Sequence, residues 1–190
     1  MNIPFFDIKR VQKPYAKLIE KAVIACLNQG TYINGKEVKE IEERCSKLLR
    51  TEHAISCANG TDALTIAIDS LNLKPNSEVI IPSFNYVSAS ECCVKNGLKP
   101  IFCDVDLLSF NVTLKNIKDK LSPSTRLVIV PHLFGLPINE IEDISNYCKS
   151  KNIFLIEDNA QSFGTSINGK KCGTFGDIST TSFFPTKNLG

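Results

Sequence analysis

The order of apolar and polar positions divides the chain into an N-terminal helical part and a longer part in which strands and helices alternate. In residues 14–29 apolar side chains recur three or four positions apart and Gly30 follows, which predicts an amphipathic helix that ends at the glycine. Residues 36–50 repeat this spacing. From about residue 52 onward, short apolar runs alternate with helical patterns, which predicts an α/β fold.

The strands of this second part are predicted from short, continuously apolar runs. Runs of this kind are typical of strands buried on both faces, as in a parallel sheet that helices cover. The predicted strands are His53–Cys57, Glu78–Ile81, Pro100–Cys103, Leu127–Val130, Ile153–Glu157 and Ile178–Phe183, and the predicted helices begin at Thr61 or span Val87–Asn96 and Asn139–Lys151. In such sheets ligands bind beyond the carboxyl ends of the strands. The residues that follow each strand are therefore the candidates for chemistry.

Composition narrows the class of protein. The chain of 190 residues is 43% hydrophobic and 22% charged with a net charge of +2, which is typical of a soluble globular protein and excludes disordered or collagen-like chains. No basic cluster indicates nucleic acid or an anionic membrane, and no apolar run approaches the ~20 residues of a membrane span. The N-terminus lacks the apolar region of a signal peptide, so we expect a cytoplasmic protein.

The eight cysteines and two histidines do not have the spacing of a metal site. No CxxC pair occurs, so zinc binding is not expected. Most of the cysteines lie within apolar periodic runs, where a free thiol behaves as a small hydrophobic side chain. We therefore expect buried, reduced thiols and no metal ion.

The first candidate segment is Ala58-Asn-Gly-Thr-Asp62, which opens a predicted helix. Gly60 allows close approach of a ligand, and the N–H groups of a helix N-terminus together with the Thr61 hydroxyl favour a phosphate. The alternative is ordinary helix capping by Asn59 or Thr61, which needs the same residue types. The segment matches neither a Walker motif nor GxGxxG.

Two further candidates follow other strands. Tyr86 is either a core aromatic residue or a ring that stacks on a planar ligand. Asp158 follows a buried strand, where it can cap the next turn, bind Mg²⁺, or pair with a protonated ring nitrogen such as that of pyridoxal phosphate.

Lys187 follows the last predicted strand. A single lysine is most often a solvated surface residue, but a partly desolvated lysine supplies a neutral amine for a Schiff base. A phosphate-binding turn, an aromatic ring, a carboxylate and a lysine converge at one edge of the sheet. Together they supply the contacts that pyridoxal phosphate needs.

Four segments in the same order resemble the DegT/StrS family of sugar aminotransferases. The resemblance covers essentially the whole chain, and residues 30–38 resemble the family's substrate-side loop. The four segments are Ile55-Ser-Cys-Ala-Asn-Gly-Thr-Asp-Ala-Leu64, Pro82-Ser-Phe-Asn-Tyr-Val-Ser88, Glu157-Asp-Asn-Ala-Gln-Ser-Phe-Gly164 and Thr181-Ser-Phe-Phe-Pro-Thr-Lys-Asn-Leu-Gly190.

The resemblance implies a fold and a role for each candidate residue. The fold is the large domain of fold type I pyridoxal-phosphate enzymes, a mostly parallel sheet between helices. Lys187 matches the lysine that binds the cofactor covalently and carries protons, and Asp158 matches the carboxylate beside the ring nitrogen. His132, in Pro131-His-Leu-Phe-Gly135, is interpreted as structural. The remaining matches are Gln161 near the 3-hydroxyl, Gly60, Thr61 and Ser182 at the phosphate, and Tyr86 stacked on the ring.

The same resemblance implies the reaction and the extent of the enzyme. Lysine rather than histidine at 187 favours amino transfer, usually from glutamate, to a keto sugar on a nucleoside diphosphate, and the wording of the motifs favours 3-keto sugars. Members of the family are about twice as long and work as homodimers. We therefore expect a helical segment in residues 1–51, a truncated cofactor-binding domain in residues 52–190, and no C-terminal small domain. The alternatives are a non-catalytic remnant, half of a split enzyme, or a nucleotide-binding α/β module.

Overall fold

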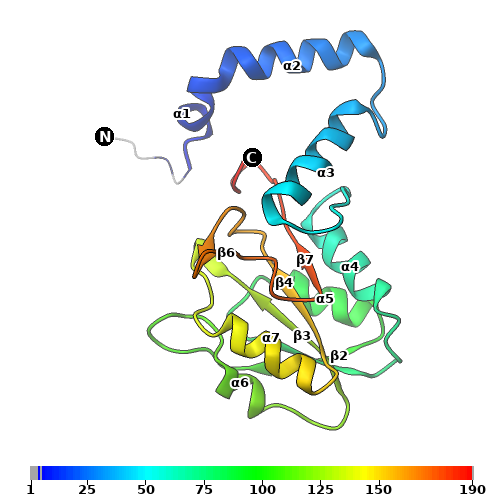
Figure 1. Cartoon of the computed structure of the whole chain (residues 1–190), viewed down its shortest axis with the longest axis vertical. Coiled ribbons are helices and arrows are strands. Elements are labelled where there is room, and N and C mark those ends of the chain that lie inside the picture. Colours follow the sequence, from blue (N-terminus) through cyan, green and yellow to red (C-terminus); the bar gives the residue numbers. More distant parts are fainter. Residues whose placement is uncertain (1–3, 5, 190) are drawn as a thin grey trace. The chain divides into compact units, whose positions relative to one another are not determined.

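The computed structural model describes residue 4 and residues 6–189. Contacts within the chain group it into two units, one up to Ser56 and one from Cys57 to Leu189 (Figure 1).

The first unit is helical. It contains helix α1 (Ile8–Gln12), the 3₁₀ turn η1 (Lys13–Tyr15), α2 (Ala16–Gln29) and α3 (Lys36–Leu49). Gly30 ends α2 with a left-handed φ of 70°, which confirms the stop that the sequence predicts. The predicted helices at 14–29 and 36–50 are thus confirmed, although Pro14 lies in the 3₁₀ turn that precedes α2.

The second unit is built on a parallel sheet of five strands in the order β2-β1-β3-β4-β7. All four neighbouring pairs are parallel, which confirms the predicted sheet. The strands are β1 (Glu78–Pro82), β2 (Lys99–Cys103), β3 (Thr125–Pro131), β4 (Phe154–Asp158) and β7 (Ile178–Thr180). Strands β2 and β7 are the outer strands (Figure 1).

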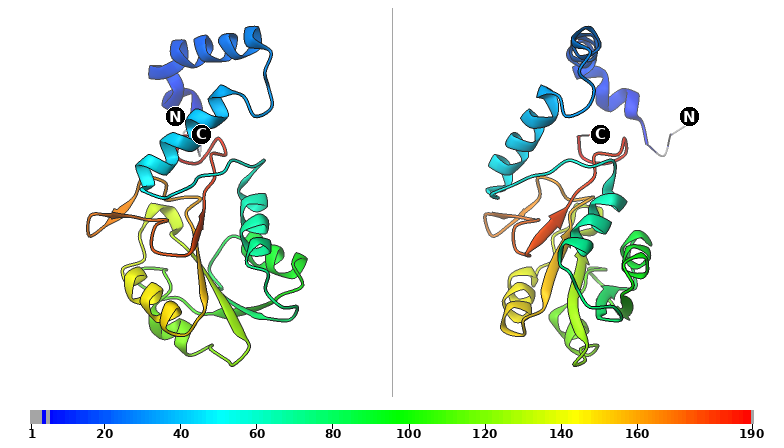
Figure 2. Two further views of the ribbon diagram at one scale, coloured as in Figure 1. Left: turned by 45° about the vertical axis from the view of Figure 1, so that its right-hand side comes forward. Right: turned by 90° about the vertical axis from the view of Figure 1, so that its right-hand side faces the viewer.

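Helices cover both faces of this sheet (Figure 2). On one face α4 (Gly60–Ser70) and α5 (Ser88–Lys95) pack on Val79 and Ile81 of β1. On the other face α6 (Leu114–Lys118) and α7 (Ile141–Ser150) pack in the cluster that holds Ile80. Alternate residues of each strand therefore enter two separate cores, which explains why the strands read as continuous apolar runs.

Two of the predicted strands need correction. His53–Cys57 forms no strand: Ile55 is 87% exposed, and no neighbouring strand of the described chain pairs with the segment. The last strand was predicted as Ile178–Phe183 but ends at Thr180. Its partner β4 ends at Asp158, so the paired ladder stops there and residues from Thr181 onward leave the sheet.

The smaller elements have little sequence signal. These are α6, the 3₁₀ turn η2 (Leu133–Gly135) and the hairpin of β5 (Ser166–Ile167) and β6 (Lys170–Lys171). No helix within the described part of the chain is long and apolar enough to cross a bilayer.

The cysteines are all free, and five of the eight are buried. The expectation of buried thiols thus holds for Cys92, Cys93, Cys103, Cys148 and Cys172 but fails for the exposed Cys57.

Candidate active site

The carboxyl ends of the central strands lie at one edge of the sheet. The last residue of β4, Asp158, pairs in register with Pro131 of β3 and with Thr180 of β7. Likewise Pro82 of β1 pairs with Cys103 of β2. The loops that follow these strands therefore leave the sheet from a common edge, as the sequence analysis expects.

Helix α4 begins beside this edge. Asn59 is its N-cap, and the Asn59 Oδ1 accepts a hydrogen bond of 2.9 Å from the Asp62 backbone N–H. The capping interpretation is therefore correct for Asn59. It leaves Gly60 and Thr61 at the first two helical positions, where N–H groups have no partner within the helix. Capping and anion binding are thus compatible in this segment.

Gly60 lies against the chain that leaves β7. A Cβ atom on Gly60 would be 3.1 Å from the Ser182 Cβ and 3.5 Å from its Oγ. The start of α4 and Ser182 therefore form one small surface of N–H and hydroxyl groups. The structure brings together the three residues, Gly60, Thr61 and Ser182, that the sequence groups as a phosphate site.

Asp158 and Lys187 form the next part of the site. Asp158 is only 8% exposed, and its Oδ1 accepts a 3.1 Å hydrogen bond from the Ala160 N–H. Burial raises the pKa of the Asp158 carboxyl, while the nearby charge of Lys187 acts in the opposite direction. Lys187 is half-buried in a turn in which its backbone N–H donates to the Phe184 carbonyl at 2.7 Å. The charge of Lys187 thus acts on the Asp158 carboxyl, although no ion pair joins the two side chains within the described residues.

Gln161 has a defined amide orientation. Its Oε1 accepts a 2.7 Å hydrogen bond from the backbone N–H of Phe134, a residue of η2 with a left-handed φ of 56°. Because the oxygen is engaged, the Nε2 group is the end of the amide that is left to donate to a ligand.

Tyr86 is placed differently from the other candidates. Its side chain is 67% exposed on the loop after β1, so the interpretation as a core aromatic residue is wrong. No hydrogen bond or aromatic pair joins the Tyr86 ring to another described residue, and its backbone N–H donates to Asn85 Oδ1 at 2.7 Å. Its ring remains free to contact a ligand.

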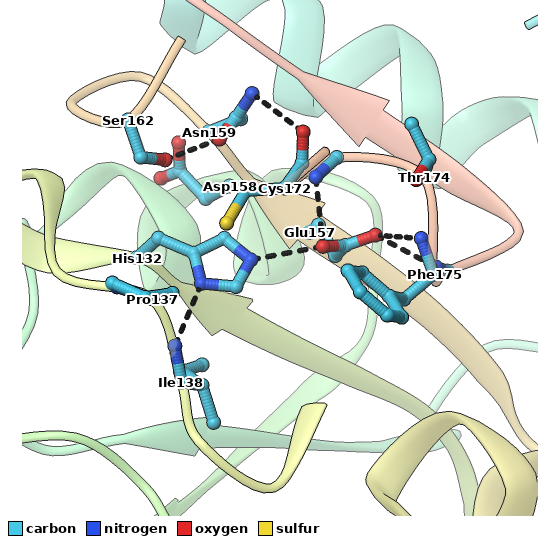
Figure 3. Close-up of polar contacts among 12 residues, drawn as sticks. His132, Pro137, Ile138, Glu157, Asp158, Asn159, Ser162, Cys172, Thr174 and Phe175 are labelled. Carbon is cyan, nitrogen blue, oxygen red and sulfur yellow. Dashed lines mark hydrogen bonds and ion pairs between the residues drawn. The ribbon is translucent and has the colours of Figure 1, made fainter. Parts of the chain in front are cut away.

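A buried acidic residue lies next to Asp158, and the sequence analysis missed it (Figure 3). Glu157 is fully buried, and its Oε2 lies 2.8 Å from Nε2 of His132, which is also fully buried. Burial alone would raise the pKa of Glu157, but hydrogen bonds from His132 and from the Gly176 and Gly173 N–H groups outweigh it and lower the pKa. The sequence feature that could have indicated Glu157 is an acidic residue at the end of an apolar predicted strand.

Within the described residues no three metal-ligating side chains cluster.

These features belong to a large domain of the type found in aminotransferases. Residues 15–190 match the model of the DegT/DnrJ/EryC1/StrS aminotransferase family, and the chain belongs to that family.

Two curated relatives illustrate the match. The chain is 35% identical over 188 residues to UDP-N-acetyl-3-dehydro-alpha-D-glucosamine 3-aminotransferase of Acidithiobacillus ferrooxidans, covering 99% of this chain and 51% of that protein. It is 37% identical over 188 residues to UDP-2-acetamido-2-deoxy-3-oxo-D-glucuronate aminotransferase of Pseudomonas aeruginosa, covering 99% and 52%. The chain spans about half the length of the curated relatives that it matches.

Solved structures agree in fold. An aminotransferase of the family from Brucella abortus superposes with a TM-score of 0.91 at 33% identity, over 100% of this chain and 52% of that one. NtdA from Bacillus subtilis, solved with bound PMP, gives a TM-score of 0.90 at 26% identity, over 100% and 42%. The predicted large-domain fold is therefore confirmed.

Proposed function

We propose that this chain carries the cofactor half of a pyridoxal-phosphate-dependent aminotransferase that transfers an amino group from an amino acid, glutamate, to a keto sugar on a nucleoside diphosphate. The single observation that supports this most is the grouping of Asp158, Lys187 and the α4 N-terminus with Ser182 at one sheet edge. A cationic ring, a carbonyl and a phosphate are the three chemical groups that these residues suit.

The phosphate would be held at the start of α4. Gly60 and Thr61 present helix N-terminal N–H groups, Thr61 and Ser182 add hydroxyl groups, and the helix dipole favours negative charge there. A Cβ atom on Gly60 would crowd Ser182 at 3.1 Å, so a larger side chain would have to displace it. The polar surface and the close backbone approach thus fit the phosphate end of the cofactor.

The ring would lie beside Asp158. A carboxylate of raised pKa in a buried place gains most from a cationic N–H, so Asp158 would keep the ring nitrogen protonated. When bound, the protonated ring supplies an electron sink for the reacting carbon. Gln161 would donate from Nε2 to the 3-hydroxyl oxygen, and Tyr86 would stack on the ring face.

Lys187 would bind the cofactor carbonyl covalently through its Nζ. Once displaced from the cofactor, the same Nζ would carry the proton. Its half-buried position, in a turn closed by its own N–H, limits the paths that the amine can take. Placing the base within reach of the reacting carbon is the main contribution of such a residue.

The substrate assignment is inferred from the relatives. The two relatives described above are named for a 3-dehydro and a 3-oxo nucleotide sugar, which supports a 3-keto sugar as acceptor. We also propose a helical segment in residues 1–51, a cofactor domain in residues 52–190, a small domain outside this chain, and a homodimer of the completed enzyme. The alternative is a non-catalytic remnant or half of a split enzyme that needs a partner polypeptide.

The test is covalent binding of the cofactor to the 190-residue chain. We expect an absorption band at about 400–430 nm that borohydride removes, with the reduced adduct on the peptide that contains Lys187. Lys187→Ala should lose both the band and the adduct. Lys171→Ala is the matched control, because Lys171 is also half-buried in this unit and should keep both. A reducible adduct that persists in Lys187→Ala would contradict the assignment.

A further inference from the structure

We propose that Glu157, together with His132, is a positioning pair that holds in place the separate chain segments carrying the ligand-facing groups of this site. This inference rests on the proposed function for the identity of the ligand. It assigns to Glu157 a role distinct from that of its neighbour Asp158. Neither side chain of the pair reaches the ligand surface, since both are fully buried.

Glu157 collects four donors on its two carboxylate oxygens. Oε1 accepts from the backbone N–H groups of Phe175 at 2.6 Å and Gly176 at 2.7 Å. Oε2 accepts from the Gly173 N–H at 2.8 Å and lies 2.8 Å from Nε2 of His132 (Figure 3). A carboxylate with this many charge-assisted bonds fixes the loop 173–176 on the end of β4. That loop leads directly into β7 and the residues that follow it.

The loop is closely fitted to the strand below it. A Cβ on Gly176 would lie 2.6 Å from the Leu155 carbonyl oxygen, so only glycine fits there. Gly173 has a φ of 86°, which glycine adopts without strain. These N–H groups therefore reach Glu157 only in this conformation of the loop. Replacing the carboxylate would therefore free the loop to move, and with it the chain that leads to Ser182 and Lys187.

His132 extends the same hydrogen-bond network to the chain segment between His132 and Ile138. Its Nδ1 accepts a 3.1 Å hydrogen bond from the Ile138 N–H, so Nε2 carries the proton and donates to Glu157. The chain between His132 and Ile138 contains η2, and there the Phe134 N–H holds the amide of Gln161 at 2.7 Å. Glu157 and His132 thus determine where this turn sits above the sheet edge.

Asp158 is held between the other segments. It follows Glu157 in β4, so the two side chains project to opposite faces of the strand. The His132 backbone N–H donates to the Asp158 carbonyl oxygen at 3.1 Å, and the Asn159 N–H donates to the Thr180 carbonyl oxygen at 2.7 Å. Loss of the buried pair is therefore transmitted to the backbone on both sides of Asp158.

The experiment uses the 190-residue chain with three variants. Glu157→Gln keeps the size of the side chain but faces an NH₂ group toward backbone donors. His132→Asn keeps an acceptor for the Ile138 N–H and removes the donor to Glu157. Asp177→Asn is the matched control, because Asp177 also accepts a backbone N–H of β4, that of Leu155 at 2.8 Å, but lies on the surface.

Two measurements report on the geometry of the site and not only on the stability of the fold. The first is the dissociation constant of pyridoxal phosphate, which should rise about 10-fold or more in Glu157→Gln and His132→Asn, as for outer-shell partners of metal ligands. The second is the titration of the Asp158 carboxyl by ¹³C NMR without cofactor. In both variants its pKa should fall toward the ordinary range as the carboxyl becomes hydrated, although in His132→Asn the loss of His132, which lowers the pKa of Asp158 in the parent chain, acts in the opposite direction. Asp177→Asn should change neither quantity.

Folded variants that bind cofactor and titrate Asp158 like the parent chain would overturn the proposal. If Glu157→Gln does not fold, His132→Asn decides by the same two criteria. If the parent chain does not bind pyridoxal phosphate, the proposed function fails. The titration of Asp158 then still decides whether Glu157 and His132 position that carboxyl.

Discussion

Replacing Glu157 by glutamine should destabilise the chain far more than the removal of one charge from a protein surface. The carboxylate is fully buried and accepts from three backbone N–H groups and from His132. Glutamine has one oxygen and one NH₂ group, so whichever way the amide is turned, two of these donors lose their acceptor. The NH₂ group then also faces donors instead of an oxygen.

The magnitude follows from the number of orphaned groups. Each buried donor without a partner costs about 1–3 kcal/mol, so two of them cost about 2–6 kcal/mol. A domain of this size has a total stability of about 5–15 kcal/mol, so the change is a large fraction of it. Asp177→Asn should cost less than about 1 kcal/mol, because an exposed asparagine oxygen can still accept from the Leu155 N–H.

The loss should depend on pH in a defined direction. The pKa of Glu157 is lower in the folded chain than its ordinary value of 4.5. Its contribution to stability is therefore complete above that ordinary value and is lost as the pH falls through the lowered, folded-state pKa. The difference between the parent chain and Glu157→Gln should be constant near neutral pH and should narrow in acid.

Urea denaturation followed by far-UV circular dichroism at several pH values measures both effects. The free energy of unfolding of Glu157→Gln should be lower by the stated amount at pH 7, with an unchanged denaturant slope. A loss below about 0.5 kcal/mol at pH 7, similar to that of Asp177→Asn, would refute the view that Glu157 is a buried anion saturated with donors.

Three further outcomes are expected. Burial raises the pKa of Asp158, so its charge costs stability once the pH exceeds the ordinary carboxyl value; Asp158→Asn should raise the denaturation midpoint of the cofactor-free chain at pH 7, with no gain at pH 3. Gly60→Ala gains helix propensity but crowds Ser182, so the thermal melting temperature should change little. Binding of pyridoxal phosphate, measured by absorbance, should weaken about tenfold, as expected for one lost hydrogen bond to a phosphate. In alkylation followed by mass spectrometry, the exposed Cys57 should react before Cys93, whose pKa burial raises to about 12.

The sheet was predictable from the sequence because its physical cause is local. Leu127–Val130 and Ile153–Ile156 are apolar at every position, and all of them except the exposed Phe154 are divided between the two cores on opposite faces of the sheet. The errors arose where the outcome depends on a distant partner. His53–Cys57 looks like a strand, but strands need neighbours, and β7 ends with its partner β4 rather than with its own apolar run.

The position of part of the candidate site was predictable for the same reason. Asp158 ends β4, and Ser182 and Lys187 follow β7, so the parallel sheet places them near one edge, whereas Gly60 and Thr61 begin α4 and follow no strand. The role of Glu157 was not predictable, because its donors come from backbone N–H groups. Any residue type can supply such a donor, so the sequence around positions 173–176 gives little indication that these groups turn inward.

Glu157 and Asp158 show how one dipeptide supplies two carboxyl groups of opposite character. Glu157 receives a full set of donors, which lowers its pKa and makes it a fixed internal anion. Asp158 receives one backbone N–H and is otherwise buried, which raises its pKa. Environments that shift the pKa values of two neighbouring carboxyl groups in opposite directions separate a structural role from a chemical one. The burial that makes the Asp158 charge unfavourable in the free chain also strengthens its attraction to a cationic ring nitrogen, so the chain gives up stability at the atom where it would hold its cofactor.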